Sequence, residues 1–479
     1  MTHLRQGGTP PSATQIAPPG ATVPAARPSP VPAGLPAPPR RTAFAEGADR
    51  LRAAAATEPG RLRVIGAVLA LLVVAFGAVT AWQTAGRSAA ADDVLHRSQP
   101  LSAGAADIYR SLADANTAAS SGFLSGGQEP AATTERYEND IRAAAAGLVA
   151  AAAGTESGSP AAKTIATLNK LLPEYKGLIE RARANNRQGF PVGGAYLRAA
   201  DELMQQRMLP AAQDLYTEEN QRLRSDYADA TPYPWFALAL GVLALAALGW
   251  AQRRQYRRTN RVFNRGLVAA TACTAVALLW LAVGHSVARA GLNSSYDGAV
   301  RSLNALQDAR IASLNARGNE NLTLVSRGAE TRQLPDGTVE DAYDYAFQQD
   351  MKTLSEGLAR ARTLADDPAG EEPVKAAADR TTEWQQRHKQ ARTADDNGDY
   401  QAALDKIIGT GKDKPTGESF DAVDAHLAKA LTHEESQFRQ AAGDGRDALS
   451  GLPLGAAVLA VLGASGAVLG IGRRLSEYR

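Results

Sequence analysis

Six arginines lie close together near the middle of the chain and form its most concentrated basic motif. No Asp or Glu separates them, and guanidinium groups bind carboxylates and phosphates well. The motif could therefore contact an acidic surface on a cytoplasmic partner or the headgroups of anionic lipids. Control of membrane topology alone would also explain it, so both interpretations stay open. The candidate contact residues are Arg253, Arg254, Arg257, Arg258, Arg261 and Arg265.

Other residues that could do chemistry form no recognisable constellation. His426 and His433 lie seven residues apart, with His388 on the preceding predicted helix. A metal site needs convergent ligands held by further partners, so we expect these histidines on solvated helix surfaces. The only cysteine, Cys273, can form neither a disulfide within the chain nor a cysteine metal cluster. The sequence has no GxxxxGK(S/T), HExxH, GxSxG or kinase signature. We expect no enzyme activity, no metal or other cofactor, and no nucleic-acid partner.

The basic motif lies between two of four long stretches that contain no Asp, Glu, Lys or Arg. A helix of about 20 residues rises roughly 30 Å, which matches the hydrocarbon core of a membrane. Buried helices of soluble proteins rarely stay uncharged on every face for this length. The sequence therefore predicts an integral membrane protein with four transmembrane helices, at residues 64–86, 233–252, 266–288 and 452–472.

Arginines also flank the first and last spans, and their distribution predicts the orientation. Short cytoplasmic flanks carry an excess of Lys and Arg, so all three basic flanks belong on the cytoplasmic side. Both termini are then cytoplasmic, 253–265 is a cytoplasmic loop, 473–479 is a short cytoplasmic tail, and the plasma membrane is the expected location. The flanking arginines are Arg50, Arg52, Arg61 and Arg63 before the first span, and Arg473, Arg474 and Arg479 after the fourth.

The tail at residues 1–60 is rich in Pro and Ala and poor in bulky apolar residues up to about residue 45. Such a segment cannot bury enough surface to fold, so it is expected to be disordered, with local polyproline II structure. Its proline pairs could serve a proline-binding module, or the tail could have little function.

The two long segments between spans, 87–232 and 289–451, are predicted to be extracytoplasmic helical bundles. Both are rich in strong helix formers, and apolar residues recur at helical spacing. Gly and Pro punctuation divides each segment into about four helices. The predicted fold is therefore all-α, with two tandem four-helix bundles. The apolar stripes are Ile165, Leu168, Leu172, Tyr175 and Ile179 in the first segment, and Phe420, Val423, Leu427 and Leu431 in the second.

The two segments resemble each other in order and spacing, which predicts an internal duplication. Tyr137 through Asp140 pair with Phe347 through Asp350 at an offset of 210, and Tyr175 pairs with Trp384 at 209. Near the end of each segment, 218–221 (Glu-Glu-Asn-Gln) pairs with 434–437 (Glu-Glu-Ser-Gln).

Helices are expected to continue from the first and third spans into the bundles without a break. Pro232 and Pro234 interrupt the second connection, and Pro453 marks the last. A helix displacement in a bundle could therefore pass into the membrane mainly through the first and third spans. The spans lack the polar groups of a transport pathway, and Gly466 with Gly470 forms a GxxxG motif suited to helix packing.

The layout is similar to that of the GlnX-type membrane transducers of actinobacteria, over about 60–475. This resemblance implies a four-span transducer between a glutamine- or glutamate-sensing lipoprotein and a soluble serine/threonine protein kinase. It implies no residue-level roles. The residues nearest to a shared motif are Tyr175, Ala182, Arg183 and Gly189, with Trp384, Ala391, Arg392 and Gly398.

The expected function is transmembrane signalling. An extracytoplasmic nutrient signal would arrive through an amino-acid-binding lipoprotein and pass to a cytoplasmic kinase, because the chain has no output domain of its own. The alternative is a structural or scaffold protein of the cell envelope. A transporter or membrane enzyme is a third possibility. The sequence leaves open whether either bundle binds a small molecule directly.

Overall fold

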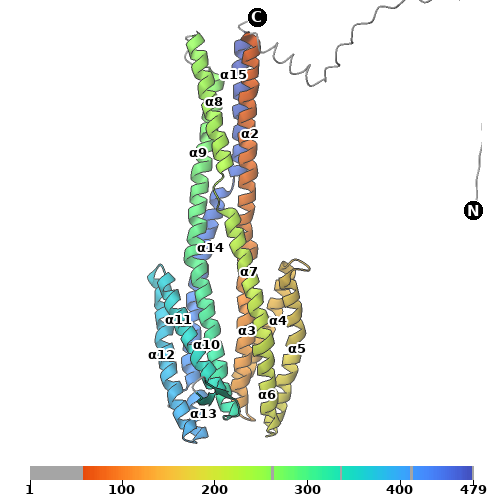
Figure 1. Ribbon diagram of the computed structural model, residues 1–479, viewed down its shortest axis with the longest axis vertical. Coiled ribbons are helices and arrows are strands. Elements are labelled where there is room, and N and C mark those ends of the chain that lie inside the picture. Colours follow the sequence, from red (N-terminus) through yellow and green to blue (C-terminus); the bar gives the residue numbers. More distant parts are fainter. Residues whose placement is uncertain (1–57, 260–263, 335–336, 410–413, 477–479) are drawn as a thin grey trace, which may run out of the picture. The chain divides into compact units, whose positions relative to one another are not determined.

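The computed structural model describes residues 58–259, 264–334, 337–409 and 414–476. These residues belong almost entirely to the second of two compact units, Pro59–Arg479. Apart from one short hairpin, the described parts of the chain consist of helices and the turns that join them (Figure 1), which confirms the all-α prediction. The Pro-rich tail lies almost wholly outside the described residues.

Each half of this unit repeats one order of elements, in which a span leads into a bundle and the bundle into a second span. We call α3 to α7 the first bundle and α10 to α14 the second bundle. The first half comprises α2 (Glu58–Asp93), η1 (Val94–Ser98), α3 (Gln99–Leu124), α4 (Ala131–Gly154), α5 (Pro160–Arg187), α6 (Val192–Leu203), η2 (Met204–Met208), α7 (Leu209–Ala230) and α8 (Trp235–Thr259). The second half comprises α9 (Arg265–Ser294), η3 (Ser295–Val300), α10 (Arg301–Ser326), β1 (Thr331–Gln333), β2 (Val339–Asp341), α11 (Ala342–Leu364), α12 (Pro368–Asp396), α13 (Tyr400–Ile408), α14 (Thr416–Leu449) and α15 (Leu452–Ser476).

Four helices are long and apolar enough to cross a membrane, which confirms the four predicted spans and makes the chain a multi-pass membrane protein. The apolar windows lie in α2, α8, α9 and α15, and much of their surface faces outward. Their inward faces form a small apolar core to which all four helices contribute. Phe76 of α2 extends this core toward the bundles by packing with Ala237 of α8 and Leu281 of α9.

Glycines set the closest helix contacts among the spans. The GxxxG motif of α15 packs on α9, where a Cβ added to Gly266 would lie only 2.4 Å from the carbonyl oxygen of Gly466 and 2.5 Å from the Cα of Gly470. On another face of α15, a Cβ on Gly77 of α2 would lie 2.1 Å from the Cβ of Ala460. Such contacts require small residues on both helices. The motif is therefore used within the chain, and α15 packs against spans from both halves.

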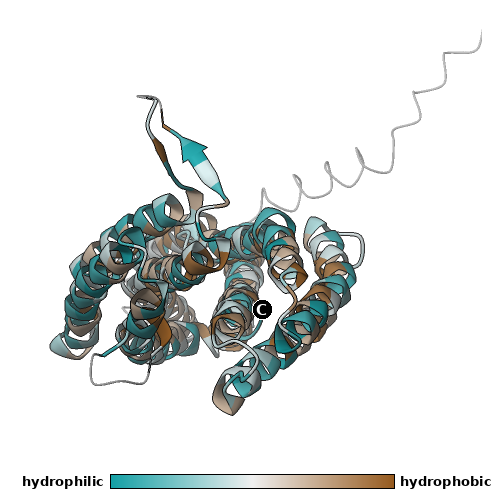
Figure 2. Ribbon diagram, turned by 90° about the horizontal axis from the view of Figure 1, so that it is seen from below, coloured by the Kyte–Doolittle hydropathy of each residue, from teal (hydrophilic) through white to brown (hydrophobic). Residues whose placement is uncertain are grey.

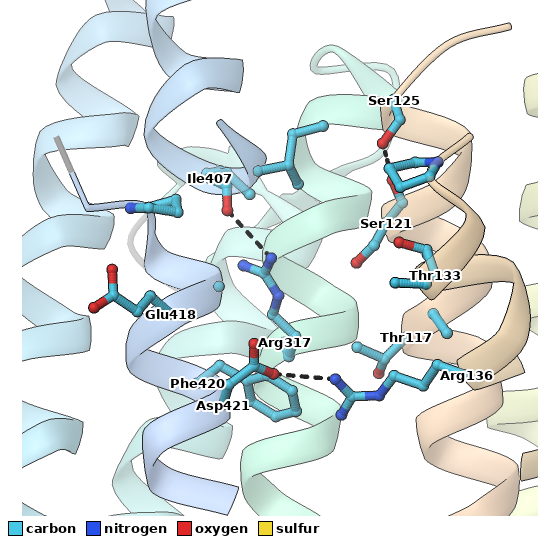
Figure 3. Close-up of a pocket in the computed structure, with 16 residues that line it drawn as sticks. Thr117, Ser121, Ser125, Thr133, Arg136, Arg317, Ile407, Glu418, Phe420 and Asp421 are labelled. Carbon is cyan, nitrogen blue, oxygen red and sulfur yellow. Dashed lines mark hydrogen bonds and ion pairs between the residues drawn. The ribbon is translucent and has the colours of Figure 1, made fainter. Parts of the chain in front are cut away.

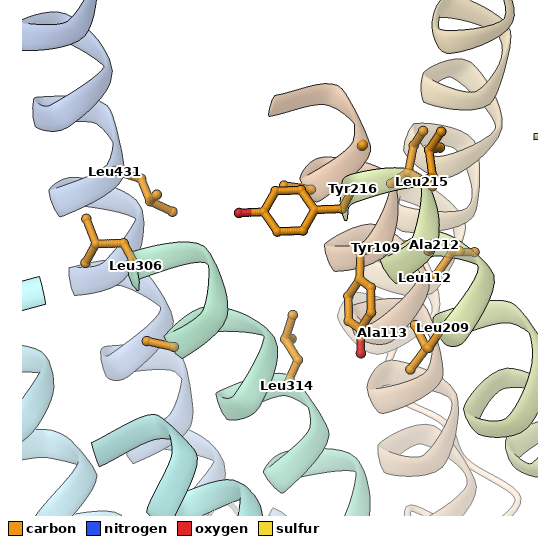
Figure 4. Close-up of a cluster of buried hydrophobic side chains, with 14 of the residues drawn as sticks. Tyr109, Leu112, Ala113, Leu209, Ala212, Leu215, Tyr216, Leu306, Leu314 and Leu431 are labelled. Atoms are coloured by element: carbon orange, nitrogen blue, oxygen red, sulfur yellow. The ribbon is translucent and has the colours of Figure 1, made fainter. Parts of the chain in front are cut away.

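The two bundles share one apolar core and are not separate domains. A single cluster of buried side chains runs through α3 and α7 of the first bundle and α10 and α14 of the second. Figure 4 shows Tyr216 of α7 directed toward Leu306 of α10 and Leu431 of α14. The hairpins α4–α5 and α11–α12 lie outside this central group of four long helices (Figure 1). The structure thus joins the two predicted bundles along their long helices.

The predicted apolar stripes are buried as expected, and side-chain caps begin several of the helices. All nine stripe residues lie in the core of the bundles. The Ser159 hydroxyl accepts a hydrogen bond from the Ala162 amide at the start of α5, and Asp367 accepts one from the Gly370 amide at the start of α12. These caps satisfy amide groups that have no partner inside the helix.

One feature of the second bundle is absent from the sequence prediction, namely the antiparallel pair β1–β2 between α10 and α11. Thr331 pairs with Asp341 and Gln333 with Val339. Gly337 lies in the connecting turn with a positive φ of 87°, a conformation that glycine adopts readily. Figure 2 shows the hairpin projecting away from the helices. The sequence marked this place correctly as a helix break, but strands of three residues are too short to show an alternating pattern.

Candidate functional site

Two helices run without interruption from the membrane core into the bundles. The stretch Gly60–Leu124 has 65 residues and Arg265–Ser326 has 62, so each is roughly 95 Å long at about 1.5 Å per residue. The return helices are broken instead. Thr231 to Pro234 separate α7 from α8, and Ser450 with Gly451 separates α14 from α15. The prediction that the first and third spans provide the continuous connections is confirmed.

Each continuous helix contains one π-helical turn where the span passes into the bundle. In η1 the Gln99 amide bonds the Val94 carbonyl, and in η3 the Arg301 amide bonds that of Tyr296. Pro100 accounts for η1, because a proline removes one helical hydrogen bond and its ring crowds the carbonyl four residues earlier. Pro210 follows η2 in the same way. Such turns widen a helix locally and occur often at functional sites.

The two π turns lie at a junction where both halves of the chain meet. The Tyr227 hydroxyl of α7 is 2.6 Å from the Ser295 hydroxyl in η3, and its ring packs edge-on against Tyr296 with centroids 5.0 Å apart. Arg446 of α14 donates to Asp92, just before η1, at 2.8 Å. A shift of α3 or α10 must therefore pass through contacts that connect the two halves.

A network of buried charged groups holds the second bundle together. Glu320 of α10 is fully buried and accepts hydrogen bonds from Arg317 at 2.6 Å and from the Trp384 indole at 3.1 Å. His388 lies 3.0 Å from Glu320 and 2.8 Å from Asp344, and its ring stacks on Phe347. This network connects α10, α11 and α12.

Hydrogen bonding keeps the members of this network ionised. Burial alone would lower the pKa of His388, but hydrogen bonds with Asp344 and Glu320 raise it above the usual value. Burial would raise the pKa of both carboxyls, yet their bonds to His388, with the positive charge of Arg317 for Glu320, lower it below the usual range. The second bundle therefore encloses ionised carboxylates paired with cations, an arrangement that depends on every partner being present.

The first bundle has a counterpart without a paired cation at the same place in the repeat. Tyr175 of α5, like Trp384 of α12, is completely buried. Its hydroxyl donates to the side-chain oxygen Oδ1 of Asn116 at 3.1 Å, and the side-chain nitrogen Nδ2 of Asn116 donates to Asp201 at 2.8 Å. Burial raises the pKa of Asp201 to about 6 against this hydrogen bond. Both bundles thus connect a buried aromatic residue to a polar group on the long helix, but only the second uses paired charges.

The repeat also places one carboxyl at the same position in each bundle. Asp140 of α4 and Asp350 of α11 are the acids of the aligned segments, and burial raises the pKa of each to about 7. The charge of Asp114 adds to the shift of Asp140. Asn319 donates to Asp350 at 2.8 Å. These carboxyls hold a proton at a pH where exposed carboxyls have lost theirs.

The structure shifts the last matched segment of the repeat by one residue. Glu219 of α7 and Glu434 of α14 are both buried, at 4% and 3% exposure, and Leu223 and Phe438 follow four residues later in each helix. The pairing of Glu218 with Glu434 was therefore wrong, and Glu219 is the equivalent residue. Two adjacent glutamates can be aligned in either register by identity, whereas burial distinguishes the two.

The prediction for His388 was also wrong. It is 4% exposed rather than solvated, because Glu320 and Asp344 reach it from α10 and α11. Glu320 is 68 residues distant in sequence, so helical spacing within α12 could not reveal it. His433 is half-buried and lies 3.0 Å from Asp367. Among the described residues, no group of three or more His, Cys, Asp or Glu side chains is arranged so that it could hold a metal ion.

The two bundles enclose a cavity of about 410 Å³ near the ends that lie farthest from the spans. The first bundle contributes α3 and α4, and the second contributes α10, α13 and α14 (Figure 3). Arg317 of α10 and Arg136 of α4 supply the cations, and Asp421 and Glu418 of α14 the carboxylates. Beside the cavity, Asn321 of α10 donates to the Ser121 hydroxyl of α3 at 2.8 Å. The sequence offered no signal for this cavity, since its walls come from helices up to 300 residues apart.

The arginine motif lies at the opposite end of the unit, where α8 ends and α9 begins. Arg253, Arg257 and Arg265 are exposed, and Arg254 is half-buried over the ring of Trp250. Arg258 lies in the last turn of α8, and Arg261 lies outside the described residues. The motif therefore belongs to the short connection between two spans, and its role as a partner or lipid contact stays a prediction.

Comparison with known proteins supports a sensing role. Residues 90–228 match the family described as Actinobacterial sensor domain. The matched region begins at the end of α2 and covers α3 to nearly the end of α7, which is the first bundle. The chain is thus similar to actinobacterial sensors and transducers. Searches of curated proteins and of solved structures found no match.

Proposed function

We propose that this protein is a transmembrane signal transducer that receives an extracytoplasmic nutrient signal and passes it to a cytoplasmic protein kinase. The two continuous helices carry this proposal. Each connects a sensor-like bundle to the membrane core without a flexible link, and each meets the other half at a π turn. Packed helices shift by an ångström or two when an interface changes state, and a continuous helix passes such a shift into the span.

The proposed orientation has both termini in the cytoplasm and both bundles outside. Three short flanks are rich in arginine, and they fall on one side of the membrane if all four spans cross. The exposed arginines at the end of α8 then face the cytoplasm and would bind an acidic surface of the kinase or anionic lipid headgroups.

The proposed partners are an amino-acid-binding lipoprotein outside and a serine/threonine protein kinase inside. Support comes from the sensor match of the first bundle. The long bundles offer helical surfaces well clear of the membrane, where a binding protein could dock.

Crosslinking tests these partnerships. The full chain is purified from its own membranes after mild crosslinking, beside a variant in which Arg253, Arg254 and Arg257 are changed to Gln. We expect a kinase and a solute-binding lipoprotein with the wild type, and loss of the kinase alone with the variant. Recovery of neither protein with the wild type would favour the scaffold alternative and contradict the proposal.

A further inference from the structure

The cavity between the bundles has the shape and chemistry of a small-molecule site. Its volume of about 410 Å³ lies within the range of roughly 300–1,000 Å³ that is usual for ligand sites. Both signs of charge line it, with Arg136 and Arg317 against Glu418 and Asp421. The ionisable groups of the lining thus balance, which suits a ligand that itself carries both charges.

A buried guanidinium forms the inner end of the cavity. Arg317 is 4% exposed and donates to Glu320, to the Thr416 hydroxyl at 2.9 Å and to the Ile407 carbonyl at 3.2 Å. Among the described residues these bonds use three of the five N–H groups of a guanidinium. Gly417 lets the side chain lie there, since a Cβ at this position would be 2.9 Å from its Nη2 atom. A carboxylate could bind the remaining donors without displacing Glu320.

Hydroxyl groups of the first bundle face this guanidinium across the cavity. Thr117 and Ser121 of α3 and Thr133 of α4 line the opposite wall (Figure 3). Thr117 donates to the Leu314 carbonyl at 3.1 Å, which fixes its position against α10. Each hydroxyl oxygen can also accept or share a hydrogen bond with a polar ligand.

The outer part of the cavity carries exposed acid. Asp421 has a side chain 64% exposed and pairs with Arg136 at 3.0 Å, while Glu418 pairs with Lys414 at 3.0 Å. Arg136 is held independently by Asp114 at 2.9 Å and lies over the Phe420 ring. Asp421 can therefore turn toward a ligand ammonium group while Arg136 keeps a carboxylate partner.

We propose that this cavity binds a free α-amino acid directly, with its carboxylate at Arg317 and its ammonium group at Asp421. The site is complete only when both bundles are present, because the hydroxyl wall belongs to the first and Arg317 to the second. The bound amino acid would be a signal that the proposed transducer senses directly. This signalling role rests on the proposed function, whereas the binding itself does not.

Binding at this place would act on the helices that enter the membrane. A ligand held between α3 and Arg317 bridges α3 and α10, the two helices that continue into spans. A carboxylate at Arg317 also competes with Glu320 for its positive charge, and Glu320 is bonded to His388. Ligand binding should therefore change the interaction between Glu320 and His388, and a change in that interaction should in turn change the affinity for the ligand.

Binding is measured by calorimetry on the full chain in lipid nanodiscs, with each of the twenty L-amino acids in turn. No lipoprotein or kinase is present, so failure here overturns direct binding and leaves the proposed transduction to its own test. We expect at least one saturable ligand. Its N-acetyl derivative, which lacks the ammonium group, and its carboxamide, which lacks the carboxylate, should each bind at least about tenfold more weakly.

Two variants test whether the ligand binds at the proposed residues. A third variant controls for the loss of one negative charge elsewhere on the same helix. Asp421→Asn should weaken binding about tenfold, and Arg317→Lys more strongly, because lysine lacks the planar fork. Asp444→Asn removes an exposed acid from the same helix and should change nothing. The ligand should also shift the NMR signal of His388. Unfolding temperature shows whether Arg317→Lys folds, and Asp421→Asn tests the site if it does not. Absence of binding by every amino acid, or unchanged binding by Asp421→Asn, would overturn the proposal.

Discussion

The two bundles share one plan of helices but differ in what holds their interiors together. In the first, Tyr175 and Asn116 form a hydrogen-bonded chain to Asp201. In the second, Trp384 joins a network of paired charges around Glu320. The last two helices of each bundle differ too. In the first bundle η2 joins α6 to α7, whereas in the second α13 and α14 are separate helices. The two bundles thus share packing positions, while the chemistry at those positions differs.

This difference shapes the cavity near the far ends, because the two bundles contribute different kinds of residues to its lining. The break between α13 and α14 places Ile407 and Thr416 where they hold Arg317 at the cavity. The first bundle offers hydroxyls and Arg136, which pairs with Asp421 of the second bundle. Divergence of the two repeats therefore creates an asymmetric site from a symmetric plan.

Removal of Glu320 should be the most damaging change. Glu320→Ala leaves Arg317, His388 and Trp384 buried without their shared partner, and breaking a buried ion pair from one side costs about 3–5 kcal/mol. Asn116→Ala in the first bundle removes hydrogen bonds but breaks no ion pair, and should cost roughly 1–3 kcal/mol. Denaturant unfolding of the full chain in detergent measures both. Equal losses would show that the two interiors do not differ in the way we describe.

Stability should fall as the pH rises from about 4 to about 7. Asp140 and Asp350 hold protons up to about pH 7 when folded, against an ordinary value of 3.8, so the folded state binds more protons in this window. A rise of about three pKa units corresponds to roughly 4 kcal/mol per group at about 1.4 kcal/mol per unit, and screening by solvent reduces this to roughly 2–4 kcal/mol because neither group is fully buried. Thermal unfolding at pH 5 and pH 8 measures it.

Paired variants then separate the bundles. Asp140→Asn and Asp350→Asn should each flatten part of the pH profile. With both in place, a loss of stability at higher pH should persist from His388 and Asp201, because the pKa of each is raised in the folded state and the stabilisation is lost as the pH rises through that pKa. A flat profile in the double variant would contradict the role of His388 in the second bundle.

Substitution of a closely packed glycine in the spans should cost less stability than removal of Glu320. The cost should depend on whether that glycine of α15 contacts α9. Gly466→Leu places a side chain against Gly266 of α9 and should cost about 1–3 kcal/mol by overpacking. Gly472→Leu, where an added Cβ meets nothing, is the matched control and should be neutral. Unfolding temperature in detergent checks both, and an equal response would exclude a specific α9–α15 contact.

Features that follow from the residues of one helix were predictable from the sequence. Features that depend on residues of several helices meeting in space were not. Uncharged length identified the spans, and the spacing of Ile165, Leu168 and Leu172 identified a buried helix face, because both properties repeat along one helix. His388 and Arg317 bind partners on other helices, and their positions along their own helices do not reveal those partners. The cavity depends on five helices from the two bundles. Pro100 and Pro210 were local signals of π turns that the sequence did carry.

Changing the rotational phase of the helix between the first span and the first bundle tests the proposed signal transmission most directly. One alanine inserted after Ala89 of α2 turns the bundle by about 100° relative to the span, whereas seven residues restore the phase to within about 20°. The readout is phosphorylation by the co-purified kinase in cells moved from medium with amino acids to medium without. We predict that the single insertion abolishes the response and that the seven-residue insertion retains it. A response that survives the single insertion would contradict transmission through this helix.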